Sequence, residues 1–248
     1  MTTKWFDRYT SYKCLDMSEP TNLFWYSSVT VQLLFCAHLL WTGLAKNHPI
    51  FTLYLGSAVV RSLVAFYLTA GYQSALPISY TYFWLWSEPV LLLLQIAVTL
   101  EVHSGMWKEY ANVVKPARPI LFFLLLTALV FAAVPVKIEL SRFGTIQLQV
   151  VMRFEFLMTR YVSTVLALFL GFSAVLFLVV IRNSIKNSLL RHESMLAAYF
   201  GIYAVAYFAV NMGWTRTSLV NNYMLSALTL CLVVWISIFR PGQDLVSE

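Results

Sequence analysis

The chain has 248 residues, of which 60% are hydrophobic and only 11% are charged. A soluble domain is typically about 45–50% apolar and about 25% charged, so a water-soluble fold of this size has no way to bury so much apolar surface. The composition therefore excludes a soluble enzyme, a disordered chain and a nucleic-acid-binding module, and the net charge of +6 fits loops that contact anionic lipid headgroups.

Seven apolar stretches follow one another along the chain. They run over residues 23–44, 49–72, 78–103, 119–136, 156–181, 195–213 and 218–239. Each is close to the roughly 20 residues that cross about 30 Å of hydrocarbon as a helix. Their hydrophobic pattern has a helical period and not the alternation of a strand. We therefore expect an all-α fold in which residues 1–248 form a single domain, a bundle of seven transmembrane helices.

Polar and charged residues mark the tails and two of the connections. Residues 1–22 form a polar tail, and the apolar run after them is too long for a signal peptide, so we expect it to remain as a membrane helix. Residues 105–118 predict a charged loop. Residues 137–155 mix charged and apolar side chains, which predicts an amphipathic or helix-extending segment at the membrane surface. Residues 240–248 form a second polar tail.

The orientation in the membrane depends on Lys and Arg, which divide almost evenly between the two sides of the predicted topology. The positive-inside rule gives most weight to short loops close to helix ends. The basic stretch at residues 182–191 and Arg240 fit that weighting best on the cytoplasmic side. We therefore expect the N-terminus outside and the C-terminus inside.

Two ionisable residues lie inside apolar stretches, where a charge is costly and marks a candidate functional site. Arg61 is in the second stretch and Glu88 is in the third. At 1.5 Å per residue, both lie roughly 15–16 Å from the same membrane face. Because a short turn joins the two helices, they are antiparallel neighbours. The sequence therefore predicts an Arg61–Glu88 ion pair near the middle of the membrane.

A polar stripe follows the third helix. Thr81, Glu88 and Gln95 recur every seven residues, so they share one helix face, which we expect to point into the bundle. Two interpretations of the ion pair stay open. It locks two helices together, or it belongs to a site for a ligand, an ion or a proton.

The four histidines lie nearer one membrane surface than the other, whatever the orientation. Two of them, His38 and His103, are weak candidates for haem ligands between helices. The alternative is that these side chains cap helix ends or bond to neighbouring residues. We predict no cofactor and no metal.

Polar residues near the ends of the last three helices form a second candidate site, on the other face. They are Arg160, Asn211, Arg216, Asn221 and Asn222. Together they suggest a polar vestibule that receives an anionic or hydrogen-bonding ligand. The alternative is ordinary helix-end polarity, in which long side chains reach toward the headgroups. Aromatic residues toward the same face, Trp84 among them, are typical of an interfacial belt.

The positions of lysine, aspartate, glycine and cysteine exclude several kinds of chemistry. All seven lysines lie in tails or connections, which excludes a buried retinal Schiff base. All three aspartates lie in the tails, which excludes an intramembrane aspartyl protease. There is no Walker or dinucleotide-binding glycine motif, and the three cysteines show no CxxC spacing.

Three segments carry a resemblance to a known group of proteins. Residues 82–89 read YFWLWSEP, residues 99–103 read TLEVH, and residues 235–241 read WISIFRP. The chain resembles small, stand-alone bacterial seven-helix membrane proteins of uncharacterised function, in which an aromatic-rich start of the third helix leads to a glutamate. The resemblance implies a bacterial inner membrane and a role for Glu88, and it implies no specific activity.

Three function classes remain open. The first is a non-enzymatic membrane component, a small ligand-sensing or accessory subunit that works with a protein partner or a second copy of the chain. The second is a small-solute transporter that acts as a dimer. The third is an intramembrane enzyme with Glu88 as general base. In each, the bilayer is the surrounding medium, and we expect no nucleic acid.

Overall fold

The computed structural model describes residues 19–69, 78–107, 111–143, 148–180, 187–212 and 217–238. These residues form seven α-helices and one 3-10 turn. They are α2 (Glu19–Trp41), η1 (Leu44–Lys46), α3 (Pro49–Thr69), α4 (Ile78–Met106), α5 (Ala111–Phe143), α6 (Leu148–Val180), α7 (Asn187–Met212) and α8 (Thr217–Ile238). All seven α-helices are long and apolar enough to cross a membrane. The predicted all-α seven-helix bundle is confirmed, and the chain is an integral membrane protein.

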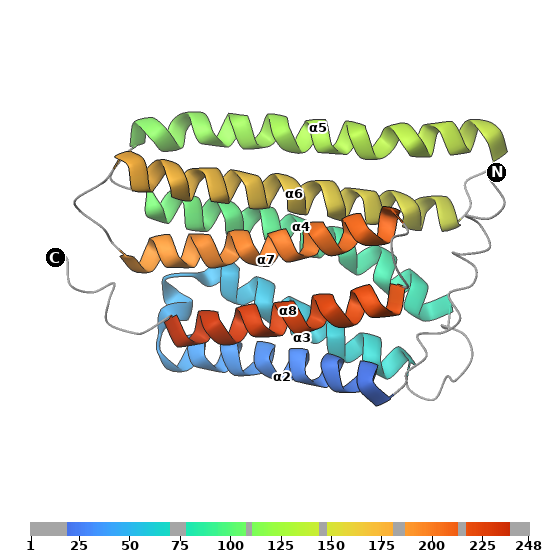
Figure 1. Ribbon diagram of the computed structural model, residues 1–248, viewed down its shortest axis with the longest axis horizontal. Coiled ribbons are helices and arrows are strands. Elements are labelled where there is room, and N and C mark those ends of the chain that lie inside the picture. Colours follow the sequence, from blue (N-terminus) through green and yellow to red (C-terminus); the bar gives the residue numbers. More distant parts are fainter. Residues whose placement is uncertain are drawn as a thin grey trace.

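By their contacts, six of the helices form a closed ring, and the seventh, α5, lies outside it, along the top edge of Figure 1. Around the ring, α2 packs against α3, α3 against α4, α4 against α6 and α7, α6 against α7, α7 against α8, and α8 against α2. Helix α5 packs mainly against α6. Consecutive helices run in opposite directions, so the bundle has an α3/α4 end, on the right of Figure 1, and an α6/α7 end, on the left.

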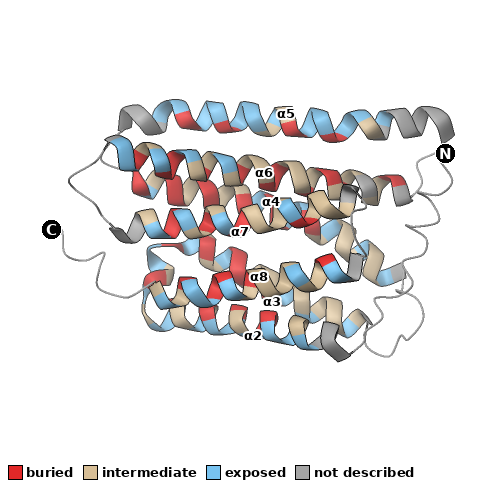
Figure 2. Cartoon of the chain, viewed as in Figure 1, coloured by how far each residue is buried: buried red, intermediate tan, exposed pale blue. Residues whose placement is uncertain are grey.

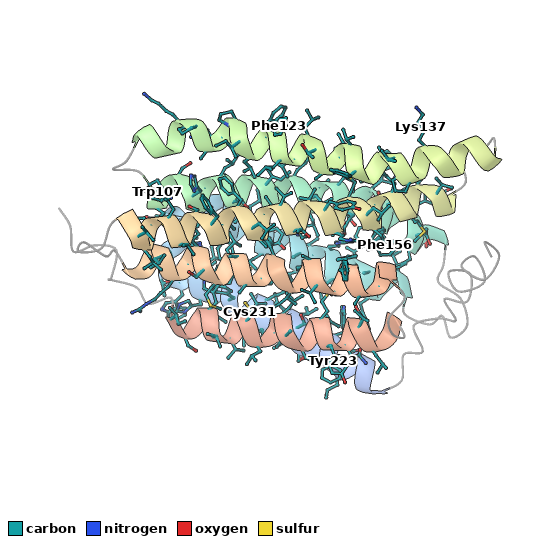
Figure 3. The ribbon with its side chains drawn as sticks, turned by 45° about the horizontal axis from the view of Figure 1, so that its top comes forward. Trp107, Phe123, Lys137, Phe156, Tyr223 and Cys231 are labelled. Carbon is teal, nitrogen blue, oxygen red and sulfur yellow. The ribbon has the colours of Figure 1, made fainter. Side chains whose placement is uncertain are left out.

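The core of the ring is made of large apolar side chains that are fully buried, such as Phe35, Phe51, Leu166 and Trp235. Large apolar side chains also cover the outside, above all along α5 (Figure 2), where Phe123 is 67% exposed (labelled in Figure 3). This surface would be costly in water and is favourable against lipid tails. The exposed faces of the helices therefore fit direct contact with the bilayer.

One boundary differs from that expected from the sequence, and the segment at 137–155 takes the helix-extending form. Helix α5 begins at Ala111, so much of the expected loop at 105–118 is helical, and the apolar span begins at Lys115. In the range 137–155, α5 continues to Phe143 and α6 begins at Leu148, so helix ends occupy most of the expected surface segment. The physical reason is that long helices carry their charged residues beyond the apolar part of the span. Residues 1–18 and 239–248 lie outside the described residues.

Helix α3 is anchored to α4 at the α6/α7 end by a carboxylate. The backbone N–H of Ile50 donates to Oε1 of Glu101 over 3.0 Å, and the N–H of Phe51 donates to Oε2 over 2.9 Å. The first N–H groups of a helix have no partner within the helix, and the positive end of its dipole favours a negative charge. Glu101 therefore caps α3 and fixes its position against α4.

Replacement of this cap tests its contribution. We expect Glu101→Ala to destabilise the protein by about 1.5–3 kcal/mol, because two hydrogen bonds to a charged group are lost. Glu101→Gln retains one oxygen that accepts a hydrogen bond, so its loss should be smaller. The measurement is the unfolding temperature in detergent, followed by size-exclusion chromatography after heating. Equal unfolding temperatures for wild type and Glu101→Ala would contradict the capping role.

Candidate functional site

Arg61 of α3 and Glu88 of α4, which the sequence predicts to meet, form an ion pair. The Nη2 atom of Arg61 lies 2.5 Å from Oε2 of Glu88. The Glu88 side chain is 6% exposed and the Arg61 side chain is 20% exposed. Two opposite charges taken out of water compensate each other only in close contact. The pair therefore fixes the facing sides of α3 and α4.

The surroundings of the pair hold both charges in place. Thr159 of α6 donates its hydroxyl hydrogen to Oε1 of Glu88 over 2.9 Å, so both carboxylate oxygens of Glu88 are engaged. The guanidinium of Arg61 lies 5.6 Å from the centre of the Trp84 ring, within the range of a cation–π contact. Trp84, which the sequence assigns to the interfacial belt, thus also contacts the site.

A second carboxyl group, Glu155 of α6, lies beside the ion pair. It is buried one helical turn before Thr159, which bonds to Glu88, and its Oε2 has no hydrogen-bond partner. The cluster therefore contains two carboxyl groups and one guanidinium. Sequence reasoning placed Glu155 in the surface segment, because it precedes the longest apolar run. Glu155 and Thr159 are four residues apart, so they share one helix face. This spacing was the signal in the sequence that Glu155 faces the interior of the bundle.

The cluster continues into a line of buried polar side chains where α4, α6 and α7 meet, which we call the polar seam. Its members are Glu88, Gln95, Thr99 and His103 on α4, Glu155, Thr159, Ser163 and Ser173 on α6, and Glu193 and Tyr199 on α7. From Glu155 to Ser173 the seam covers about 27 Å of helix, close to the thickness of the hydrocarbon. In Figure 3, Phe156 and Trp107 mark its two ends.

Aromatic side chains flank the middle of the seam. On α7, the rings of Tyr199 and Tyr203 lie 5.4 Å apart, and those of Tyr203 and Tyr207 are stacked at 6.3 Å. The side-chain amide of Gln95 donates to the hydroxyl of Tyr54 over 3.3 Å. The predicted inward face of α4 is thus present at Glu88 and Gln95.

At the α6/α7 end, the seam ends at the imidazole of His103, the hydroxyl of Ser173 and the carboxyl group of Glu193. The Nδ1 atom of His103 lies 2.9 Å from Oγ of Ser173, and Nε1 of Trp107 donates to the same oxygen over 2.8 Å. Oε1 of Glu193 lies 3.8 Å from Nδ1 of His103, beyond hydrogen-bond distance. Both carboxyl oxygens of Glu193 and Nε2 of His103 are buried without a hydrogen-bond partner. Sequence reasoning missed Glu193 because it precedes the apolar stretch of its helix.

Two further histidines pack beside this end of the seam. The rings of His48 and His192 lie 4.8 Å apart, and Nε1 of Trp235 donates to Nδ1 of His192 over 3.0 Å. Of the two weak haem candidates, His103 faces α6 and α7, whereas His38 lies on α2, which packs against α3 and α8. Among the described residues, no contact brings His38 and His103 together, and no group of three His, Cys, Asp or Glu side chains is arranged to hold a metal ion.

The expected vestibule and Thr81 do not join the seam. Arg160 lies over the rings of Tyr161 and Phe208, at 5.1 and 4.6 Å. Asn221 and Asn222 lie on α8, which does not pack against α6. Arg216 and the side chain of Asn211 lie outside the described residues. Thr81 is partly exposed on α4.

Comparisons with protein-family models, curated proteins and solved structures return no match for this chain. The resemblance to small bacterial seven-helix proteins therefore stays a prediction from the sequence. Several residues of the three segments on which this resemblance rests make contacts in the structure. Glu88 pairs with Arg61, Thr99 donates to the backbone oxygen of Gln95, and His103 contacts Ser173.

A double-mutant cycle tests the energetic coupling of the ion pair. We expect Arg61→Leu and Glu88→Leu each to destabilise the protein by about 3–5 kcal/mol, because each leaves one buried charge without its partner. The double variant should be more stable than either single variant, since no unpaired charge remains. The measurement is the free energy of unfolding in mixed micelles. Additive losses would show that the two side chains do not interact.

Two buried serines of α6, one midway along the seam and one at its α6/α7 end, provide a matched comparison. Ser173 contacts both His103 and Trp107, whereas the hydroxyl of Ser163 is buried without a hydrogen-bond partner. We expect Ser173→Ala to cost about 1–3 kcal/mol and Ser163→Ala to be neutral or stabilising. Thermal unfolding in detergent measures both, and the reverse order of stabilities would contradict the hydrogen bonding described here.

Proposed function

We propose that this protein is a non-enzymatic, ligand-sensing or accessory subunit of a membrane complex, with the Arg61–Glu88 pair at its binding centre. The observation that carries the proposal is the incomplete use of the Arg61 guanidinium. A guanidinium has five N–H donors, and among the described residues the ion pair of Arg61 is the one from Nη2 to Glu88. Donors held among lipid tails have no water to bond to, so the arrangement favours a ligand that supplies acceptors.

The geometry of the other polar groups supports a role without catalysis. Glu88 is a poor general base because Arg61 and Thr159 engage its two oxygens. In a Ser-His-acid triad, the serine contacts Nε2 of the histidine and the acid contacts Nδ1. Here Ser173 and Glu193 both face Nδ1 of His103. Neither Glu88 nor the group of His103, Ser173 and Glu193 therefore has the arrangement that proton transfer to a substrate requires.

The setting of the proposed subunit follows from the same residues. All the described residues belong to the helix bundle, so we propose that ligand binding is passed on through contact with a protein partner or a second copy of the chain. We further propose a bacterial inner membrane, with the N-terminus outside and the C-terminus inside. The distribution of Lys and Arg and the resemblance of the aromatic and glutamate motif support this placement.

A dimeric transporter is the second candidate, and the polar seam favours it. The seam extends along most of the hydrocarbon thickness and has carboxyl groups near both ends, Glu155 and Glu193. Chains of intramembrane carboxyl, hydroxyl and imidazole groups are typical of ion and proton pathways. A transporter requires that water reach the seam from at least one side of the membrane.

Water access to the seam separates the two candidates. The test introduces Ser163→Cys in a variant whose native cysteines are replaced, because Ser163 is fully buried midway along the seam and its hydroxyl has no partner. We expect a membrane-impermeant thiol reagent to leave this cysteine unmodified from both sides of intact membrane vesicles.

The control is Lys46→Cys in the same background, since Lys46 is exposed in η1 at the α6/α7 end and should react from one side only. That side also reports the orientation. Reaction at Ser163→Cys with either vesicle orientation would overturn the sensor in favour of the transporter.

A further inference from the structure

A groove runs along the outside of the ring between α3 and α4, with a volume of about 710 Å³. It extends along α3 from Pro49 to Arg61, about 18 Å of helix. The apolar side chains on its rims, Val60 and Val90, are 60% and 55% exposed. The groove therefore opens sideways, toward the lipid, and its volume lies within the range of small-molecule sites.

Arg61 is the charged residue that lines this groove, and it lies at one end of it. Arg61 lines the groove with a side chain that is 20% exposed, and its Nη2 atom contacts Glu88. The hydroxyl groups of Ser57 and Ser87 also line the wall, and that of Ser87 donates to the backbone oxygen of Trp84 over 3.1 Å. The remaining wall is apolar apart from Thr52, so an apolar chain with an acceptor at one end matches the surface.

The charges around Arg61 decide what kind of acceptor is suitable. Glu88 already balances the positive charge of the guanidinium. An anionic headgroup would add further negative charge in a region of low dielectric constant, where charge repulsion is strong. A neutral carbonyl oxygen accepts hydrogen bonds from Arg61 without that repulsion.

We infer that the α3/α4 groove binds a neutral lipophilic molecule that enters from the bilayer, places its hydrocarbon along the groove and accepts hydrogen bonds from Arg61 through a carbonyl oxygen. The inference deepens the proposed function, on which it rests, because it names the class of ligand that the subunit senses. Binding replaces lipid tails next to the guanidinium with an acceptor, which is the source of selectivity over a plain hydrocarbon.

The test uses the full chain in dodecyl maltoside micelles, whose molecules carry no carbonyl group. The probe is dioleoylglycerol with a photoreactive diazirine in one acyl chain, and mass spectrometry locates the cross-linked peptides. We expect cross-links on α3 and α4. Unlabelled dioleoylglycerol should compete on the order of tenfold or more tightly than hexadecane, because only the former accepts hydrogen bonds from Arg61.

Gly56→Leu provides a variant that fills the groove without touching Arg61. Gly56 lines the groove, and a Cβ atom placed there meets nothing within 4 Å, so the backbone accepts a side chain at this position. Gly171→Leu on α6 is the matched control, since a Cβ atom at that helical glycine also meets nothing within 4 Å. We expect Gly56→Leu to lose the cross-links and Gly171→Leu to retain them.

Three results would overturn the inference. They are an absence of cross-links on α3 and α4 in the wild type, equal competition by hexadecane, and stronger competition by oleate than by dioleoylglycerol. The last would replace the neutral ligand with an anionic one and leave a sensing role in place. Failure of the proposed function has a separate signature, reaction of the cysteine at position 163 with a water-soluble reagent, which does not depend on the groove.

Discussion

The contact on which the arrangement depends is the ion pair between Arg61 and Glu88. Inside a bilayer, apolar side chains gain little by turning toward other helices, because lipid tails are equally apolar. Polar groups have no such freedom, since each needs a partner within the protein. The pair therefore sets which faces of α3 and α4 meet, and the bond from Thr159 to Glu88 brings α6 to the same point.

Helix α5 illustrates what happens where no polar group needs a partner from another helix. The polar side chain in the middle of its span, Thr127, bonds to the backbone oxygen of Phe123 within its own helix. Its buried residues include Ala117, Ala128 and Ala132, small side chains that allow close approach to α6. Because α5 has no midspan polar group that needs a partner from another helix, it lies outside the ring and presents most of its surface to lipid.

The sequence predicts those parts of the structure that depend on neighbours in the chain. Spans follow from hydropathy, and the depths of Arg61 and Glu88 follow from counting residues on two consecutive antiparallel helices. The positions of Glu155 and Glu193 could not be predicted in this way. Each gains its surroundings from helices that are distant in the sequence, and the order of helices in the ring depends on side-chain packing that no periodicity reveals. The same holds for the expected vestibule, because α7 separates α6 from α8.

The position of Arg61 joins the lipid-facing surface to the interior. Arg61 lines the groove and contacts Glu88 through Nη2, and Glu88 in turn accepts a hydrogen bond from Thr159 in the polar seam. Two contacts thus connect the outer face of α3 with α6. A new hydrogen-bond acceptor at Arg61 would act on the charge that Glu88 balances, and Glu155 lies one helical turn from Thr159 on α6. An event in the lipid would reach the centre of the bundle through charge, without requiring that the apolar core repack.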